Sequence, residues 1–426
     1  MSQITQSITK FIARPSEIPS DVELHNRRLL YIEILFAGVL GGVITFNATF
    51  AVRLGATKEH IALLNSIPAL VAALFSIPTA LFVQRRVNRE RWIFRSLFAL
   101  RLGYGLLAAV PLLFGATQTA AVAVVIWIIL LNIPTIFFQN GFQALLAELV
   151  PSERRAMVFS MRTAIWSAVV VVTSILAGQW LDWIAFPLNF MILYGFGFLV
   201  AMGSNWLVGN LIIPPRKTTM IALSKKGQSA PAALPTERAR LTTPVARLLF
   251  NTGIYQSGLW LSNGLFAVFY IEILHASNGW IGLNLAVGSF GVVLGNFLWA
   301  RLLRRRSMTW GLKRAILFTW FFPIGVAVFP YFDTILILNL LVNLGHPGVE
   351  LCTISLMMKV GSDETRTVYM SWYNTVIQIS AFVAPLVGVW IAQRYGIQVA
   401  FLIASLLRII GATLFYVRPV VESSGG

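Results

Sequence analysis

Residues 102–147 read LGYGLLAAVPLLFGATQTAAVAVVIWIILLNIPTIFFQNGFQALLA, and this stretch contains no Asp, Glu, Lys or Arg. An unpaired charge at the centre of a lipid bilayer costs about 2.5 to 3.5 kcal/mol on insertion scales, so long charge-free runs locate membrane spans. One span needs about 20 apolar residues. The apolar pattern is interrupted near its middle by Gly115, Thr117, Gln118 and Thr119. The stretch therefore predicts two membrane-spanning helices joined by a tight turn.

The same criterion, applied to the whole chain, predicts twelve spans. They start near residues 29, 60, 92, 121, 160, 187, 245, 279, 310, 333, 367 and 397. The composition agrees, because 57% of the 426 residues are hydrophobic and only 12% are charged, about half the charged fraction of a soluble protein. An ordinary soluble enzyme and a disordered chain are both excluded. We expect an all-α polytopic membrane protein.

The basic residues predict how these spans are oriented. The net charge is +17, from 33 Lys and Arg against 16 Asp and Glu. If the N-terminus is cytoplasmic, 28 basic residues lie inside, three lie outside (Arg53, Lys58, Arg394) and two lie within spans (Arg101, Arg408). The positive-inside rule then places both termini in the cytoplasm, at a cell (inner or plasma) membrane. The charge is explained by topology, with anionic lipid headgroups as its partner and no need for nucleic acid.

The chain divides at its one long polar stretch. Six predicted spans precede this stretch and six follow it, and no apolar segment resembling a signal peptide precedes the first span. The expected regions are a cytoplasmic N-terminal segment (1–28), a six-helix bundle (29–213), a cytoplasmic linker (214–244), a second six-helix bundle (245–418) and a cytoplasmic tail (419–426).

Segments of the two halves match one another. LGATKEHIALL from Leu54 aligns with LHASNGWIGLN from Leu274, and Leu131-Asn132-Ile133 aligns with Val342-Asn343-Leu344. An internal repeat of this kind predicts two pseudo-symmetric bundles with the same orientation in the membrane. Substrates of such proteins bind at the interface between the repeats, near the midplane.

From about residue 29 to 418 this pattern resembles the major facilitator superfamily. The resemblance is carried by the LGAT segment at Leu54, the basic loop after the second span, LVPSERR at Leu149 and the central linker. The family's loop pattern G-x-x-x-D-R-x-G-R-R is degraded here, since Gln84 replaces the Asp while Arg85 and Arg89 keep basic positions. The resemblance implies a secondary transporter whose spans 1, 4, 7 and 10 line a central cavity.

The tenth span holds Asn343, His346 and Glu350, whose spacings of three and four residues place them on one helical face. Glu350 lies too deep in the span to reach headgroup water. A carboxyl group at this depth is by default a functional hypothesis, because burying it costs energy unless it is paired, protonated or hydrated. His346 could share its proton. The alternative is a structural pair that tethers helices.

The fourth span, the repeat partner of the tenth, carries a matching polar face. With an offset of 211 residues, Asn132 falls on Asn343, Thr135 on His346 and Gln139 on Glu350, and Gln143 continues the face by one turn. The seventh span adds Gln256, Trp260 and Asn263. Hydrogen bonds between helices would also explain isolated amides.

Two arginines lie deep within spans, Arg101 in the third and Arg408 in the twelfth. The resemblance places these spans at the periphery of each bundle, which favours a structural role for both over substrate binding. Gly38 with Gly42, and Gly291 with Gly295, have the spacing of closely packed helices.

Other chemistries find no support in the sequence. The single Cys352 and four dispersed His give no disulfide or metal site, and no Walker A motif occurs. We therefore expect a monomeric transporter without enzymatic activity, cofactor or metal, which moves a small solute by alternating access coupled to protons through Glu350. The alternatives are a uniporter or multidrug exporter without a proton carrier, and a non-transporting scaffold or sensor.

Overall fold

The computed structural model describes residues 20–84, 88–150, 152–213, 242–360 and 366–417, and within them the chain forms helices and no strand. The helices of the first half are α2 (Ser20–Ile44), α3 (Asn47–Arg53), α4 (Lys58–Gln84), α5 (Arg89–Leu106), η1 (Leu107–Ala109), α6 (Val110–Phe114), α7 (Gln118–Leu130), α8 (Asn132–Leu149), α9 (Ser152–Trp183) and α10 (Leu188–Gly209). Those of the second half are α12 (Thr243–Val268), η2 (Phe269–Ile273), α13 (Asn278–Leu302), α14 (Met308–Ile316), α15 (Phe322–Val328), α16 (Phe332–Val360), α17 (Arg366–Tyr395) and α18 (Ile397–Val417).

In the described part of the chain, these helices combine into twelve spans. Five spans are composite, namely α2–α3, α5–η1–α6, α7–α8, α12–η2 and α14–α15. Ten candidate membrane helices are long and apolar enough to cross a membrane. The other two spans depart from that pattern because α12 carries several amides and hydroxyls, while α14 and α15 are each shorter than ten residues. The predicted all-α fold of twelve spans is confirmed.

Two spans start earlier than their apolar pattern. α2 begins at Ser20 and α9 at Ser152, whereas the hydropathy predicts starts near 29 and 160. The first turn of α2 contains Asp21 and Glu23, whose negative charge is favourable at a helix N-terminus. Helical turns that extend beyond the apolar run into water are invisible to hydropathy alone.

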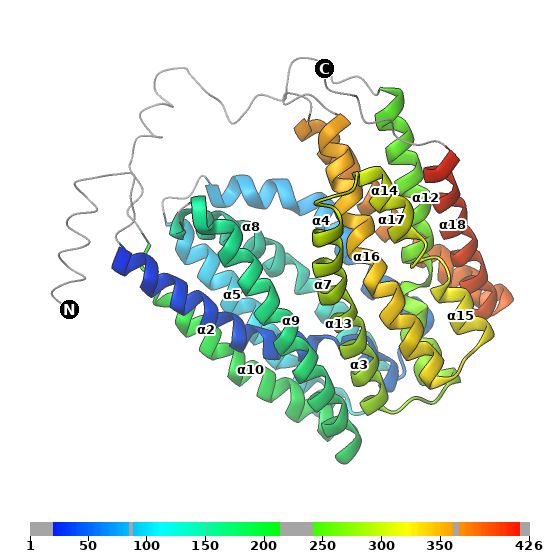
Figure 1. Cartoon of the computed structure of the whole chain (residues 1–426). Coiled ribbons are helices and arrows are strands. Elements are labelled where there is room, and N and C mark those ends of the chain that lie inside the picture. Colours follow the sequence, from blue (N-terminus) through cyan, green and yellow to red (C-terminus); the bar gives the residue numbers. More distant parts are fainter. Residues whose placement is uncertain (1–19, 85–87, 151, 214–241, 361–365, 418–426) are drawn as a thin grey trace.

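Helix packing separates the chain into two bundles (Figure 1). In the first half α2 packs on α9 and α10, and α5 packs on α8 and α10. In the second half α12 packs on α17 and α18, and α13 packs on α16. The halves meet where α9 lies along α13 and α4 lies along α17. These interface helices are the second and fifth spans of each half, so equivalent helices of the two repeats form the contact.

The buried apolar core is joined at one end of the bundles. Following the orientation expected from the basic residues, we call the end that carries Arg53, Asp182 and Ser277 the outer end, and the opposite end the inner end. At the outer end one cluster includes Phe50 of the first half and Phe401 of the second. At the inner end each half has a cluster of its own. The halves are therefore closed against one another at the outer end.

Close helix packing occurs at the predicted glycine pairs. A Cβ built on Gly42 would lie 2.5 Å from the Thr173 Cβ on α9, and one on Gly38 would lie 2.9 Å from Val169. A Cβ on Gly295 would lie 2.6 Å from the carbonyl oxygen of Leu344 on α16. The prediction that these glycines permit close approach of helices is confirmed.

Candidate functional site

A cavity of about 810 Å³ lies along the face of the second half that is turned toward the first. Four helices of the second half, α12, α13, α16 and α17, provide most of its lining. Among the described residues of the first half, Thr45, Ala48 and Thr49 contribute. The polar lining residues of the second half include Gln256, Trp260, Asn263, Asn284, Ser289, Asn339, Asn343, His346, Glu350, Tyr373, Asn374 and Arg408. Most of the lining of this cavity that the structure describes therefore comes from one bundle.

Apart from its tyrosines, the ionisable groups that line the cavity among the described residues come from α16 and α18. Glu350 is exposed in the cavity, and its carboxylate forms no ion pair or hydrogen bond with a described residue. His346, one turn earlier on α16, interacts electrostatically with both Glu350 and Arg408. Tyr373 on α17 interacts electrostatically with Glu350 as well. The structure thus brings the predicted pair of α16 together with an arginine from the twelfth span.

Arg408 is held by the fold although it lines the cavity. Its side chain is 2% exposed, and it donates hydrogen bonds to the carbonyl oxygens of Gly258 (3.3 Å) and Thr319 (2.8 Å) and to Ser262 Oγ (3.3 Å). α18 packs on the side of α12, and the long arginine side chain reaches past it. Arg408 therefore supplies a fixed positive charge behind His346.

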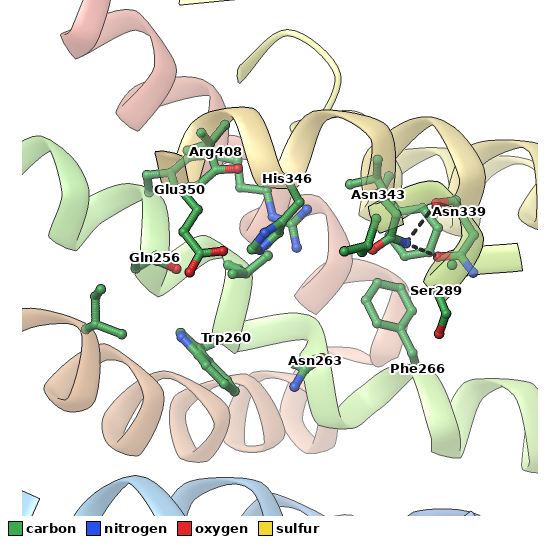
Figure 2. Close-up of a pocket in the computed structure, with 18 of the residues that line it drawn as sticks. Gln256, Trp260, Asn263, Phe266, Ser289, Asn339, Asn343, His346, Glu350 and Arg408 are labelled. Carbon is green, nitrogen blue, oxygen red and sulfur yellow. Dashed lines mark hydrogen bonds between the residues drawn. The ribbon is translucent and has the colours of Figure 1, made fainter. Parts of the chain in front are cut away.

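A chain of amides fixes the neighbouring part of the wall. Asn343 Nδ2 donates to Asn339 Oδ1 at 2.7 Å (Figure 2). Asn339 Nδ2 in turn donates to Asn284 Oδ1 at 2.9 Å. Each amide also donates to a main-chain oxygen, from Asn339 to Asn284 and from Asn343 to Asn339. The chain links α13 to α16 and sets the orientation of Asn343.

On α12, Gln256, Trp260 and Asn263 face the same cavity, as predicted. Figure 2 shows Gln256 and Trp260 pointing toward the part of the cavity that Glu350 occupies. Trp260 Nε1 and Gln256 Oε1 are buried atoms without a hydrogen-bond partner among the described residues. Buried polar atoms are costly unless they are satisfied. These two groups are thus available to a bound solute or to water.

The polar face of the fourth span lies elsewhere. Asn132 and Thr135 donate hydrogen bonds to carbonyl oxygens one turn earlier in the same span, those of Ile128 and Leu131. Gln139 is exposed on α8, and the side chain of Gln143 lies outside the described residues. Among the described side chains, those of Asn132, Thr135 and Gln139 do not line the cavity that contains Glu350.

Arg101 belongs to a buried network in the first half. Arg101 donates to Ser204 Oγ at 3.3 Å, and Ser204 donates to Glu33 at 2.8 Å. Glu33 also pairs with Arg162 at 2.9 Å. The network connects α2, α5, α9 and α10, which are the helices of one bundle. It holds that bundle together and does not face the cavity.

The residues of the degraded loop motif end one helix and start the next. Gln84 is the last residue of α4, its side chain lies outside the described residues, and so does Arg85. Arg89 begins α5 and is buried. In the described part of the chain, no group of three or more His, Cys, Asp or Glu residues is placed to hold a metal ion.

Sequence reasoning missed Asn339, Asn284 and Tyr373. Asn339 lies four residues before Asn343, so the spacing that identified the face of α16 extends to it by one more turn. Asn284 and Tyr373 are on other helices, and only the packing of α13 and α17 beside α16 brings them to the cavity.

The chain was compared with known proteins. The Major Facilitator Superfamily model matches residues 248–425. No curated protein matches the sequence. A solved structure of a bacterial homologue of the human lysosomal transporter Spinster, inward-facing and unoccupied, is 16% identical, with a TM-score of 0.61 over 93% of this chain and 96% of that one.

Two other transporters have similar structures. A mutant of the nucleoside transporter NupG is 11% identical, with a TM-score of 0.71 over 93% of this chain and 99% of that one. A POT family transporter in complex with a thioalcohol-conjugated peptide is 11% identical, with a TM-score of 0.66 over 91% of this chain and 94% of that one.

At these identities the solved structures show the fold alone, while the family match covers the second half, where the cavity lies. Together they support a multi-pass membrane protein of the transport class. The resemblance seen in the sequence is therefore confirmed: the second half of the chain matches the major facilitator superfamily, and the whole chain has the fold of its transporters.

Proposed function

We propose that this protein is a secondary transporter that moves a small solute by alternating access and couples that movement to protons through Glu350. The observation that carries the proposal is the position of this carboxyl group. It is exposed in a cavity between two membrane-spanning bundles, on the helix in the middle of the second half, without a contacting counter-charge among the described residues. The fold and the family match support the transport class.

The coupling follows from what closing the cavity would cost. While the cavity is hydrated, a charged Glu350 is tolerated. Closing the inner end around the site removes this water, and burying an unpaired carboxylate costs several kcal/mol or more. The cost is avoided when a proton or a bound solute neutralises the group. Protonation and conformation are then linked, which is the condition for coupled transport.

The residues near Glu350 can contribute to proton coupling and to solute binding. His346 lies one turn from Glu350 on α16 and can share a proton with it, and Arg408 supplies a fixed positive charge that lines the same cavity. Trp260 offers an aromatic surface and an unpartnered N–H, and Gln256 offers an unpartnered amide oxygen. This combination suits a small polar solute that has both hydrogen-bonding groups and an apolar face.

A ligand screen by thermal shift would identify the solute class, since a ligand that binds the native state stabilises it by RT ln(1 + [L]/Kd). Nucleosides and peptides are the first ligands to screen, because one of the similar structures is a nucleoside transporter and another is in complex with a thioalcohol-conjugated peptide. Sugars and organic cations complete the set. The orientation of the chain, with both termini inside, is tested separately by cysteine labelling of the outer end.

The proton role of Glu350 is tested by uptake of that solute into proteoliposomes. Glu350→Gln keeps the size of the side chain and removes its titration. We expect this variant to bind solute but to lose accumulation driven by an imposed pH gradient. Glu272→Gln is the matched control, because Glu272 is exposed and lies outside the cavity. Gradient-driven accumulation by the Glu350→Gln protein would exclude Glu350 as the proton carrier. A wild-type protein that equilibrates solute without responding to the gradient would be a uniporter.

A further inference from the structure

A carboxylate of one bundle caps a helix of the other at the outer end. Asp182 lies in the last turn of α9, in the first half, and α13 of the second half begins at Asn278. Asp182 Oδ1 accepts from the Asn278 main-chain N–H and from Asn278 Nδ2, both at 2.9 Å. Asp182 Oδ2 accepts from the Gly279 N–H at 2.6 Å. Three hydrogen bonds thus join one side chain to the opposite bundle.

These bonds complete the N-terminus of α13. The first N–H groups of a helix have no partner within that helix. Here Ser277 Oγ accepts from the Trp280 N–H, as expected of an N-cap residue, and Asp182 takes the two N–H groups before it. A negative charge is also favourable at the positive end of a helix dipole. Opening the outer end would leave Asp182 and both N–H groups without these partners.

The backbones of α9 and α13 touch at the same place. A Cβ on Gly178 would lie 2.6 Å from the carbonyl oxygen of Asn278, and one on Gly282 would lie 2.3 Å from that of Ser174. Arg53 adds a hydrogen bond of 2.9 Å to the carbonyl oxygen of Ala276, just before α13. Two longer hydrogen bonds also join described residues of the two halves, from Asn278 Nδ2 to the carbonyl oxygen of Leu181 and from Gln378 to that of Ala69, each at 3.4 Å.

We propose that Asp182 is a positioning residue of the transport cycle. Its contact with Asn278 and Gly279, which we call the Asp182 latch, holds the outer end closed and breaks each time that end opens. The inference rests on the proposed alternating access. It adds that the balance between inward- and outward-facing states is set at the outer end, far from Glu350, by one carboxylate and a glycine-lined contact.

The test measures how often the outer end opens and needs no substrate. In a Cys352→Ser background, Ala48→Cys places a thiol on α3 where it lines the cavity. A separate Glu272→Cys variant, with its thiol at an exposed position near the outer end, identifies the outer side of the membrane. A membrane-impermeant maleimide is then added to the Ala48→Cys protein from that side. Position 48 faces a cavity that is closed on this side. The labelling rate of Ala48→Cys therefore reports the fraction of molecules whose outer end is open. We expect Asp182→Asn to raise this rate about tenfold.

A second variant removes the dependence on one substitution. Gly178→Ala adds a Cβ that must push α13 away, while alanine favours the helical conformation of α9 itself. We expect it to raise the labelling rate in the same direction. Glu272→Gln, which removes a charge near the same end without an interbundle hydrogen bond, is expected to leave the rate unchanged.

If the labelling rates of the Asp182→Asn and Gly178→Ala variants are within twofold of the parent rate, the proposed role of the Asp182 latch is wrong. If the parent nevertheless reacts slowly from the outer side, alternating access survives. If position 48 never reacts from that side in any variant, the latch and alternating access both fail. The uptake result for Glu350→Gln is independent of this labelling, so failure of proton coupling is distinguishable from failure of the latch.

Discussion

At the scale of single residues, the charges buried in the two bundles are stabilised by different partners. In the first half, Glu33 forms an ion pair with Arg162 and is linked to Arg101 by hydrogen bonds through Ser204. In the second half, Arg408 has carbonyl and hydroxyl oxygens around it, and no carboxylate of a described residue is in contact with it. The first arrangement ties four helices of one bundle together. The second leaves Glu350 free of a permanent partner.

Arg162→Met is expected to destabilise the first bundle. Removing one partner of a buried ion pair costs about 3 to 5 kcal/mol, because the remaining charge is left uncompensated. We expect the apparent unfolding temperature in detergent to fall by several degrees.

Arg27→Met is the matched comparison, since Arg27 pairs with Glu23 at 3.6 Å in a more exposed position. Such pairs contribute about 0 to 1 kcal/mol, so little change is expected. Equal losses for the two variants would argue against a stabilising role for the buried network.

At the scale of secondary-structure elements, the position of α16 depends on the small residues of α13. Gly291 and Gly295 let the α16 backbone approach, and this contact sets the depth at which Asn343, His346 and Glu350 enter the cavity. The same helix, α13, receives the Asp182 latch at its other end. It therefore connects the cavity with the outer closure.

Gly295→Ala is expected to disturb that connection. The added Cβ would lie 2.6 Å from the Leu344 carbonyl oxygen and 3.1 Å from Pro347 Cγ, so α13 and α16 must separate. Overpacking of this kind costs about 1 to 3 kcal/mol, and solute binding should weaken as the wall shifts.

Gly195→Ala provides the control, because its Cβ meets nothing within 4 Å and alanine favours the helix. A thermal-shift series on both variants checks the expectation. Unchanged stability and binding in Gly295→Ala would show that the contact tolerates a methyl group.

The segment between α13 and α14 is basic, and we expect it to contact anionic lipid. Arg304, Arg305 and Arg306 are exposed there, and the guanidinium groups of Arg306 and Arg314 lie 5.4 and 6.0 Å from the centre of the Trp310 ring. Basic residues at a membrane surface each gain about 1 kcal/mol from anionic lipid. We expect phosphatidylglycerol to stabilise the protein in nanodiscs relative to phosphatidylcholine. Arg304→Gln combined with Arg305→Gln should reduce that difference, and an undiminished difference would exclude this segment as the lipid contact.

At the scale of the whole molecule, local patterns predicted the architecture but only part of the cavity. Twelve spans and their repeat follow from charge-free runs and matched segments, and the face of α16 follows from helical spacing. The contribution of Arg408 could not be read in this way, because it depends on a long side chain reaching past α12. The contact of Asp182 with α13 depends on how the two halves dock, and local sequence patterns do not predict that docking. Asn132 and Thr135 have the same spacing as the cavity face of α16, yet their side chains are bonded to their own helix.

The apolar core that joins the halves at the outer end has a thermal consequence. Opening that end must expose part of a continuous cluster that includes Phe50 and Phe401, and exposure of apolar surface to water raises the heat capacity. Hydrophobic association weakens on cooling. The two halves of this protein are therefore held together by a contact whose strength varies with temperature. Under the proposed alternating access, we expect the share of molecules facing outward to follow a curved rather than a straight van't Hoff plot.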